Sequence, residues 1–329
     1  MSSLFAGELA ALGTALCWAF SSIFFTVAGR RVGSLMVNRW RLLFAVLLVG
    51  TMHFILYGRL YPADLSTERL FWLGLSAILG LVFGDSLLFQ AYVYIGTRLA
   101  MLLMALAPIF GTLVAWILLG ETLSLSEMLA IAMAVGGVAW VVMERVGLRD
   151  SAEDAPGLQT EGQRPPAAGG LSLMGTGHTA TRRQYVLGLL CGLGGALGQA
   201  LGLVTAKRGL TGDFPALSAV LVRMAVAMLV LWAWAALRGQ LPATLHALRN
   251  DRRSTLAILG GAAMGPFLGV WLSLIGVQLA PVGIASTLNA LTPILLIPLV
   301  YILFREKTSP RALGGTLLAL GGVALMFLR

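Results

Sequence analysis

GLVFGDSLLF at residues 80–89 is followed by ALAPIF at 105–110 and AVGGVA at 134–139, and the same order of motifs returns 185 residues later. The second copies read GPFLGVWLSL at 265–274, ALTPIL at 290–295 and ALGGVA at 319–324. The 60 positions from Gly80 to Ala139 align without a gap and contain 18 identities, including Gly, Pro and Glu landmarks. A shared apolar composition would give roughly a tenth by chance. The chain therefore consists of two related halves, and the period is too long for a solenoid.

The composition indicates a polytopic membrane protein. Of 329 residues, 58% are apolar and 11% are charged, whereas soluble domains carry about 25% charged residues. Each apolar run has about 20 residues or more, enough for a helix to cross about 30 Å of hydrocarbon. Barrel strands would be about ten residues long with alternating polarity, a pattern that the sequence lacks. We predict an all-α protein with ten transmembrane helices, at residues 6–28, 34–57, 69–95, 98–119, 125–145, 185–206, 215–237, 254–279, 281–304 and 309–328.

The spans divide into two groups of five. We predict a first repeat at residues 1–146, a flexible polar linker at 147–184 that lacks the apolar surface to order itself, and a second repeat at 185–329. Because five is odd, the second repeat enters the membrane from the opposite side, which makes the halves an inverted repeat. That arrangement is typical of transporters whose binding site lies at the repeat interface near the midplane.

Composition and motifs disfavour several other classes. The formal net charge is +9, but the basic residues lie mainly in loops, which favours contact with lipid headgroups over nucleic acid. Cys17 and Cys191 lie in apolar segments, so no disulfide or metal framework is expected. The sequence contains no HExxH, GxSxG or Walker A motif, and we expect neither an enzyme nor a cofactor. The first apolar segment lacks a basic n-region and is predicted to be a resident helix.

Loop charges predict an orientation. Of the 23 Lys and Arg residues, 15 follow odd-numbered spans, whereas 5 lie in the even-numbered loops and the tails. The positive-inside rule then places both termini outside the cytoplasm.

Glycine spacing predicts close helix packing. Gly194, Gly198 and Gly202 recur every four residues, and Gly261, Gly265 and Gly269 do the same in the second half. Small residues on one ridge allow helix backbones to approach each other in lipid.

These features resemble the EamA-type branch of the drug/metabolite transporter superfamily. The resembling motifs are GELAAL at 7–12 with Trp18, RLLFA at 41–45, GDS at 84–86, AP at 107–108 leading to GE at 120–121, Arg223 with Ala227, TP at 292–293 and Glu306. The resemblance covers both halves and implies ten helices in two inverted repeats around a central cavity. It also implies secondary transport, often export, of small metabolites or amino acids, and we expect a multi-pass protein of the bacterial cytoplasmic membrane. Two features depart from the family pattern: Arg305 replaces the usual Gly, and the family tends to have cytoplasmic termini.

Asp85 is the most informative single residue. It lies roughly 16 and 24 Å of helix rise from the two ends of its span. An acid at that depth is costly in lipid and must face a cavity or a partner. Two interpretations are open. Asp85 binds and releases a proton in proton-coupled transport, or it forms a structural hydrogen bond to a neighbouring helix. Its repeat equivalent is Val270, so a site there is asymmetric.

Three arginines also lie within spans. Arg41 and Arg223 occupy matching places in the second helix of each half, about 6 to 8 residues inside, so snorkelling to the surface is favoured over ligand binding. Pointing inward, they would attract a carboxylate or pair with Asp85. Arg39 is shallower and is predicted to anchor at the interface.

Other polar and aromatic residues within spans are candidates for cavity lining, in competition with bonds to a neighbouring helix or to their own backbone. Gln199 and Asn289 rank next because an amide holds more hydrogen-bonding groups than a serine. Trp18 and Trp271 lie inside spans, where core packing competes with cavity lining. The predicted cavity residues are Trp18, Ser21, Ser22, Arg41, Asp85, Gln90, Gln199, Arg223, Trp271 and Asn289.

Pro108 and Pro293 interrupt the fourth helix of each half at equivalent points. Proline frees a backbone carbonyl and permits a bend, so both are predicted hinges, although a static kink fits as well.

The main functional hypothesis is a secondary transporter that exports a small metabolite by alternating access through a midplane cavity, with the substrate and membrane lipid as its partners. The alternative is a membrane protein that does not transport, such as an assembly factor or a receptor. A change in metabolite pools between cells lacking and overproducing the protein distinguishes the two.

Overall fold

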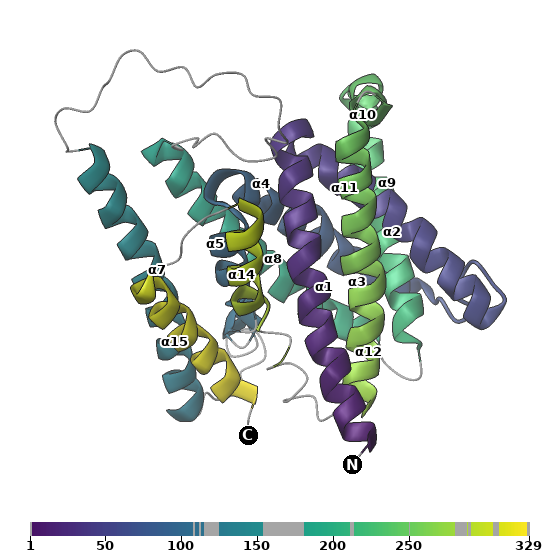
Figure 1. Cartoon of the computed structure of the whole chain (residues 1–329). Coiled ribbons are helices and arrows are strands. Elements are labelled where there is room, and N and C mark those ends of the chain that lie inside the picture. The colour runs from purple at the N-terminus through teal and green to yellow at the C-terminus, as the bar shows by residue number, and fades with distance from the viewer. Residues whose placement is uncertain are drawn as a thin grey trace.

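The described residues of the computed structural model form a bundle of helices that contains no strand (Figure 1). They are residues 2–107, 109–111, 113–114, 125–153, 181–210, 214–249, 251–279, 288, 291–304 and 309–327. Six of the helices are long and apolar enough to cross a membrane, and shorter apolar helices accompany them. The protein is therefore a polytopic helical membrane protein, as the sequence predicts.

The helices of the first half follow four of the five predicted spans closely. They are α1 (Ser2–Val32), α2 (Ser34–Tyr57), α3 (Thr67–Ala77), η1 (Ile78–Gly84), α4 (Asp85–Ile95), α5 (Thr97–Met104) and α7 (Leu125–Glu153). Three of these, from α3 to α4, form one continuous crossing of 29 residues. Of the fourth span, predicted at 98–119, the structure describes α5 and no residue beyond Val114. Helix α7 continues into the range predicted as linker, of which residues 154–180 lie outside the described residues.

The second half repeats this order with one addition. Its helices are α8 (Arg182–Gly209), α9 (Ala216–Leu237), α10 (Leu241–Arg249), α11 (Arg252–Ala262), η2 (Ala263–Gly269), α12 (Val270–Leu279), α14 (Thr292–Phe304) and α15 (Pro310–Phe327). The short helix α10 was not predicted, because nine residues are too few to cross the membrane.

The third crossing of each half contains a π-helical segment. Segment η1 ends at Gly84 and η2 ends at Gly269, and each boundary of η2 follows its counterpart in η1 by 185 residues. In η2, Pro266 removes a donor from the α-helical ladder. Single π turns inside α-helices are rare and are frequent at functional sites. The apolar pattern of the sequence predicts ordinary α-helix at both places, so the two π segments are a departure from that prediction.

The predicted glycine ridges are confirmed. A Cβ atom added at Gly198 would lie 2.7 Å from the Cα of Gly84, and one added at Gly202 would lie 2.9 Å from the Cα of Gly80. Helix α8 therefore touches η1 backbone to backbone, which no larger residue permits. In the second half, Gly261 and Gly265 instead receive side chains of α1: Phe25 lies against Gly261, and Ser21 and Trp18 lie against Gly265.

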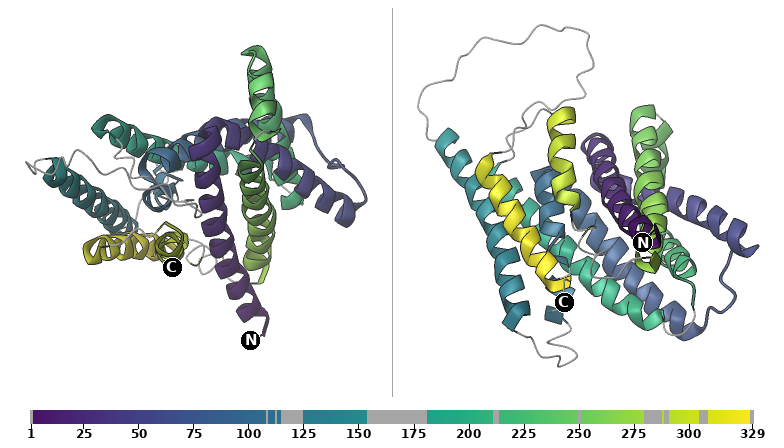
Figure 2. Two further views of the ribbon diagram at one scale, coloured as in Figure 1. Left: turned by 45° about the horizontal axis from the view of Figure 1, so that its top comes forward. Right: turned by 60° about the horizontal axis from the view of Figure 1, so that its bottom comes forward.

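Each half packs its first helix into the other half. Helix α1 lies against α11, η2 and α12, whereas α8 lies against α3, η1 and α4. The second helices, α2 and α9, pack against each other, and so do α7 and α15, which run side by side in both views of Figure 2. The largest buried apolar cluster joins α1, α4 and α5 to residues of α7, α8 and α15. The two halves therefore share one core.

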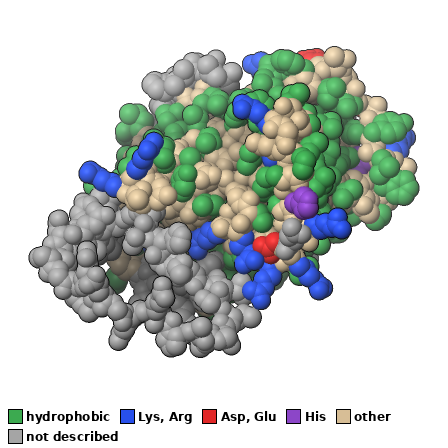
Figure 3. All heavy atoms as spheres, turned by 90° about the horizontal axis from the view of Figure 1, so that it is seen from above, with side chains coloured by type: hydrophobic (Ala, Val, Ile, Leu, Met, Phe, Trp, Pro, Cys, Tyr) green, Lys and Arg blue, Asp and Glu red, His purple; other side chains and the backbone are tan. Residues whose placement is uncertain are grey.

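The start of α1 and the end of α15 lie at one end of the bundle, and α10 lies at the other (Figure 1). Lys and Arg side chains are spread over the end that carries α10 (Figure 3). There Asp251 caps α11 by accepting from the backbone N–H groups of Arg253 and Ser254, and it pairs with Arg31 at 2.7 Å. The hydrogen bond from Arg31 lowers the pKa of Asp251 to about 2. This ion pair ties the end of α1 to the start of α11.

The contact between α7 and α15 provides a matched pair of substitutions. A Cβ atom at Gly137 would clash with the backbone of Ala319 and Gly315, whereas one at Gly136 would meet nothing within 4 Å. Gly137→Ala is expected to lower the free energy of unfolding by about 1 to 3 kcal/mol through overpacking. Gly136→Ala is expected to be neutral or to stabilise the helix by up to about 1 kcal/mol. Thermal unfolding of the purified variants in detergent checks this; equal melting temperatures would show that α7 and α15 do not pack here.

Candidate functional site

The end of η1 places Asp85 in the middle of the bundle. Its backbone N–H donates to the carbonyl of Gly80, five residues earlier, which is the bond that defines a π turn. Asp85 is the first residue of α4, and its side chain is 6% exposed. The carboxylate therefore lies among helices and does not face lipid, as an acid at this depth requires.

Both oxygens of the Asp85 carboxylate have partners. The Nη2 atom of Arg41, on α2, lies 2.6 Å from Oδ2, and the Arg41 side chain is 4% exposed. The Nε2 atom of Gln199, on α8, donates to Oδ1 at 2.5 Å. Because α8 belongs to the second half, this group of side chains crosses the junction between the halves. We call Asn38, Arg41, Asp85 and Gln199 the Asp85 cluster.

Asn38 fixes the position of the arginine. Its Oδ1 atom accepts from Arg41 Nη2 at 3.1 Å, while its Nδ2 atom donates to Leu81 O at 3.0 Å and to Ser86 Oγ at 2.9 Å. The rings of Phe89 and Phe25 have centroids 5.1 and 6.0 Å from the Arg41 Cζ atom. The guanidinium is thus held by hydrogen bonds and by aromatic faces.

Arg223 is a second guanidinium close to the cluster. It comes from α9 and lies against η1, with Nη2 3.4 Å from the place where a side chain on Gly80 would begin. It interacts electrostatically with Asp85, but within the described part of the chain its buried Nε atom has no hydrogen-bond partner. With Arg41 and Asp85, it gives the site a formal charge of +1.

The structure corrects two expectations for the arginines. Arg41 does not snorkel, because Asp85 lies across from it on α4 and neutralises it inside the bundle. Arg39 does not anchor at the interface; it is fully buried and donates to Thr244 Oγ1 at 3.0 Å and to Gln240 Oε1 at 2.7 Å. Both partners of Arg39 belong to the segment around α10, the helix that was not predicted.

Other predicted cavity residues have local roles in this conformation. Trp18 packs near Gly265 and Gly269 of η2. Ser21 donates to the Gly261 carbonyl at 2.8 Å, and Ser22 to the Ala19 carbonyl at 2.8 Å. Gln90 accepts from the Ser34 hydroxyl, away from the cluster.

Two predicted residues, Asn289 and Pro108, lie outside the described residues. Pro293 is the second residue of α14, in the first turn, where no α-helical hydrogen bond is lost. In the described residues Pro293 thus begins a helix and does not bend one.

Asn38 and Ser86 belong to the site but were not predicted from the sequence. A signal is nevertheless present for both residues. Asn38 lies three residues before Arg41 and therefore on the same helix face. Ser86 follows Asp85 directly, and its hydroxyl reaches the Asn38 amide.

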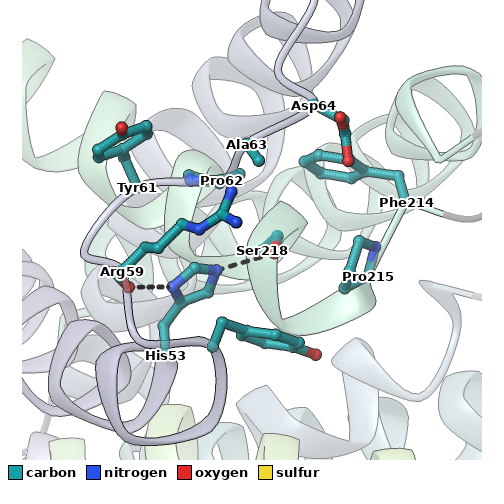
Figure 4. Close-up of a pocket in the computed structure, with 10 residues that line it drawn as sticks. His53, Arg59, Tyr61, Pro62, Ala63, Asp64, Phe214, Pro215 and Ser218 are labelled. Carbon is teal, nitrogen blue, oxygen red and sulfur yellow. Dashed lines mark hydrogen bonds between the residues drawn. The ribbon is translucent and has the colours of Figure 1, made fainter.

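Two pockets open between α2 and the second half. The larger, of about 360 Å³, is mainly apolar and includes Trp271 and Phe267, which lie 6.3 Å apart between ring centroids. The smaller, of about 200 Å³, contains His53, whose Nδ1 donates to the Arg59 carbonyl at 2.7 Å and whose Nε2 lies 2.9 Å from Ser218 Oγ (Figure 4). Neither of these pockets is lined by the Asp85 cluster, which is closed to both in this conformation.

Comparison with known proteins identifies relatives of the chain. The model of the EamA-like transporter family matches residues 5–143 and again residues 186–328. A solved structure, titled only as the crystal structure of a protein, matches with a TM-score of 0.54 and 20% sequence identity. The match covers 97% of this chain and 95% of the other, and shows a shared fold. No curated protein matches the chain.

The ion pair can be tested by removing its charges singly and together. Arg41→Met or Asp85→Leu leaves the other charge buried without its partner, which is expected to lower the free energy of unfolding by about 3 to 5 kcal/mol. The double variant removes both charges and is expected to melt closer to the wild type than either single variant. Thermal unfolding in detergent measures the three, and additive losses would contradict the pairing.

Proposed function

We propose that this chain, which belongs to the EamA-like transporter family, is a secondary transporter that exports a small metabolite or amino acid. Members of this family are membrane transporters of the drug/metabolite type and not enzymes. The observation that supports the proposal is the Asp85 cluster, because intramembrane charges that face the interior of a bundle mark solute and ion pathways.

The proposed architecture is ten spans in two inverted five-helix repeats. Three observations favour it: the family model matches once in each half, the π segments recur at equivalent positions, and each half holds the first helix of the other. Binding sites of inverted-repeat transporters lie near the midplane at the repeat interface. The Asp85 cluster is the candidate for such a site, since Gln199 comes from one half and Arg41 and Asp85 from the other.

Alternating access would act at the contact between η1 and α8. Gly80 and Gly84 meet Gly198 and Gly202 with no intervening side chains, so a shift of α8 along η1 would move two backbones that are in direct contact. Such a shift would also break the hydrogen bond from Ser76 Oγ to the Gly202 carbonyl. The hydrogen bond between Gln199 and Asp85 spans that contact, and it must break or change partner when the halves rock. The two pockets beside α2 are consistent with an opening on one side of the closed cluster.

Proton coupling through Asp85 is the second part of the proposal. A carboxylate that pairs alternately with Arg41 and with a proton can link the state of the cluster to the proton gradient. The ion pair favours the charged form of Asp85 in the closed conformation, and separation from Arg41 would favour the protonated form.

Transport can be tested before the solute is identified. Cells that overproduce the protein are expected to hold less of at least one small metabolite than cells that lack it, and that compound should then cross proteoliposomes. In proteoliposomes Asp85→Asn is expected to flatten the dependence of transport on pH, whereas Arg238→Gln, a change at the exposed end of α9, should retain it. Unchanged pools in every comparison would refute transport, and an unchanged pH profile in Asp85→Asn would refute proton coupling at this residue.

The number of spans can be tested with reporter fusions. A fusion within the linker at Gly170 and one at Arg329 are separated by five proposed spans, so their reporters should lie on opposite sides of the membrane. The 15 to 5 distribution of basic residues predicts that the linker is cytoplasmic and that Arg329 is outside. Reporters on the same side would contradict the proposed spans, and a cytoplasmic Arg329 would refute the orientation that the basic residues predict.

A further inference from the structure

We propose that Arg223 binds the carboxylate of the transported solute, so that the substrates are small organic monocarboxylates. This inference rests on the proposed function and specifies the chemical class that the site takes. Three features of the site support it: its charge balance, the donors of Arg223, and the position of Arg223 at the junction of η1, α8 and α9.

The charge balance calls for an anion. Arg41 and Asp85 neutralise each other at 2.6 Å, which leaves Arg223 as the positive charge beside the pair. A charge inside a membrane bundle is costly unless it is paired, and Asp85 already gives both oxygens to Arg41 and Gln199. A solute carboxylate would supply the second negative charge and bring the site to neutrality.

The donors of Arg223 differ from those of Arg41 and Arg39, the other arginines of the second helices, whose Nη atoms are engaged. Arg41 donates to Asp85 and Asn38, and Arg39 donates to Thr244 and Gln240. The buried Nε atoms of all three arginines lack a hydrogen-bond partner in the described part of the chain, but only Arg223 also lacks hydrogen bonds and ion pairs from its Nη atoms there. A guanidinium presents two parallel N–H groups that match both oxygens of a carboxylate, and this match favours a carboxylate over a neutral amide.

Gly80 allows Arg223 and α8 to approach η1 closely. A methyl group at Gly80 would lie 3.4 Å from Arg223 Nη2, 3.6 Å from Gly202 Cα and 3.7 Å from Gln199 Oε1, so this junction is filled in the present conformation. Arg223 is only partly buried, whereas Arg39 is fully buried. Arg223 therefore lies at the junction of η1, α8 and α9, where a shift of α8 would make room for a ligand.

The position of Asp85 leads to a second expectation, in which a substitution strengthens carboxylate binding instead of weakening it. Its negative charge acts on Arg223 and would repel an incoming carboxylate. Asp85→Asn removes that repulsion and releases Arg41 from its ion pair. Carboxylate binding should therefore become tighter in Asp85→Asn, a change that a purely structural role for Arg223 does not produce.

The test is binding to the full-length purified protein in detergent, read by thermal unfolding. The ligands are acetate, benzoate and phenylacetate, each compared with its neutral amide at the same concentration and ionic strength. A ligand that binds the native state raises the apparent melting temperature. In the wild type at least one carboxylate is expected to raise it more than its amide does.

The variants then locate the effect. Arg223→Gln is expected to weaken carboxylate binding by about tenfold or more, because it removes the positive charge and the paired N–H donors that would hold the carboxylate. Arg223→Lys should retain part of the preference, and Arg238→Gln, on the exposed end of the same helix, should retain all of it. If Arg223→Gln does not fold, Arg223→Lys and Asp85→Asn carry the test.

The outcomes separate this inference from transport itself. Equal shifts from every carboxylate and its amide in the wild type would overturn the inference, as would a preference that survives in Arg223→Gln. Either result would leave transport of a neutral solute intact. Conversely, a carboxylate preference that depends on Arg223 would support the inference even where proteoliposomes show no flux.

Discussion

The need to neutralise one carboxylate inside the membrane constrains the centre of this protein. Asp85 cannot face lipid, and a single partner from its own half satisfies only one of its oxygens. The second oxygen is reached by Gln199, which requires α8 to lie directly on η1. That approach is possible only because Gly198 and Gly202 meet Gly84 and Gly80. The glycine ridge and the π turn therefore act at one contact, between α8 of the second half and η1 of the first, where Gln199 reaches Asp85.

The two halves share a scaffold but not their chemistry. Both third crossings carry a π segment between equivalent residues, and both receive the first helix of the other half. Where the first half has Asp85, however, the second has Val270, and η2 packs against Trp18 and Ser21 of α1. Duplication thus supplied two similar helix junctions, and an acid was placed in one of them. The symmetry of the backbone therefore does not extend to the charges of the candidate site.

Much of the fold was predictable because membrane helices have a strong sequence signal. The duplicated Gly, Pro and Glu landmarks and the long apolar runs predicted the helix order. Glycine spacing predicted that α8 packs closely against another helix, but not that this helix is η1. The π turns were not predictable, because their hydrogen bonds follow tertiary contacts and leave no distinct periodicity. The burial of Arg41 was missed for a related reason: depth along one helix does not reveal a partner on another. Arg39 was missed because its partners lie around α10.

A buried ion pair contributes little to stability, which makes its place at the junction of the two halves informative. Desolvation of both ions offsets most of their attraction, so apolar residues of equal volume often stabilise a protein as well or better. In the proposed transport cycle, the groups of the pair would exchange partners when the helices around them move. Arg41 and Asp85 belong to one half, whereas Gln199 and Arg223 belong to the other and approach the same carboxylate. A shift of α8 and α9 would therefore change the second-half partners of Asp85. In the proposed transport, the cluster would then link the position of the second half to the charge that a solute meets.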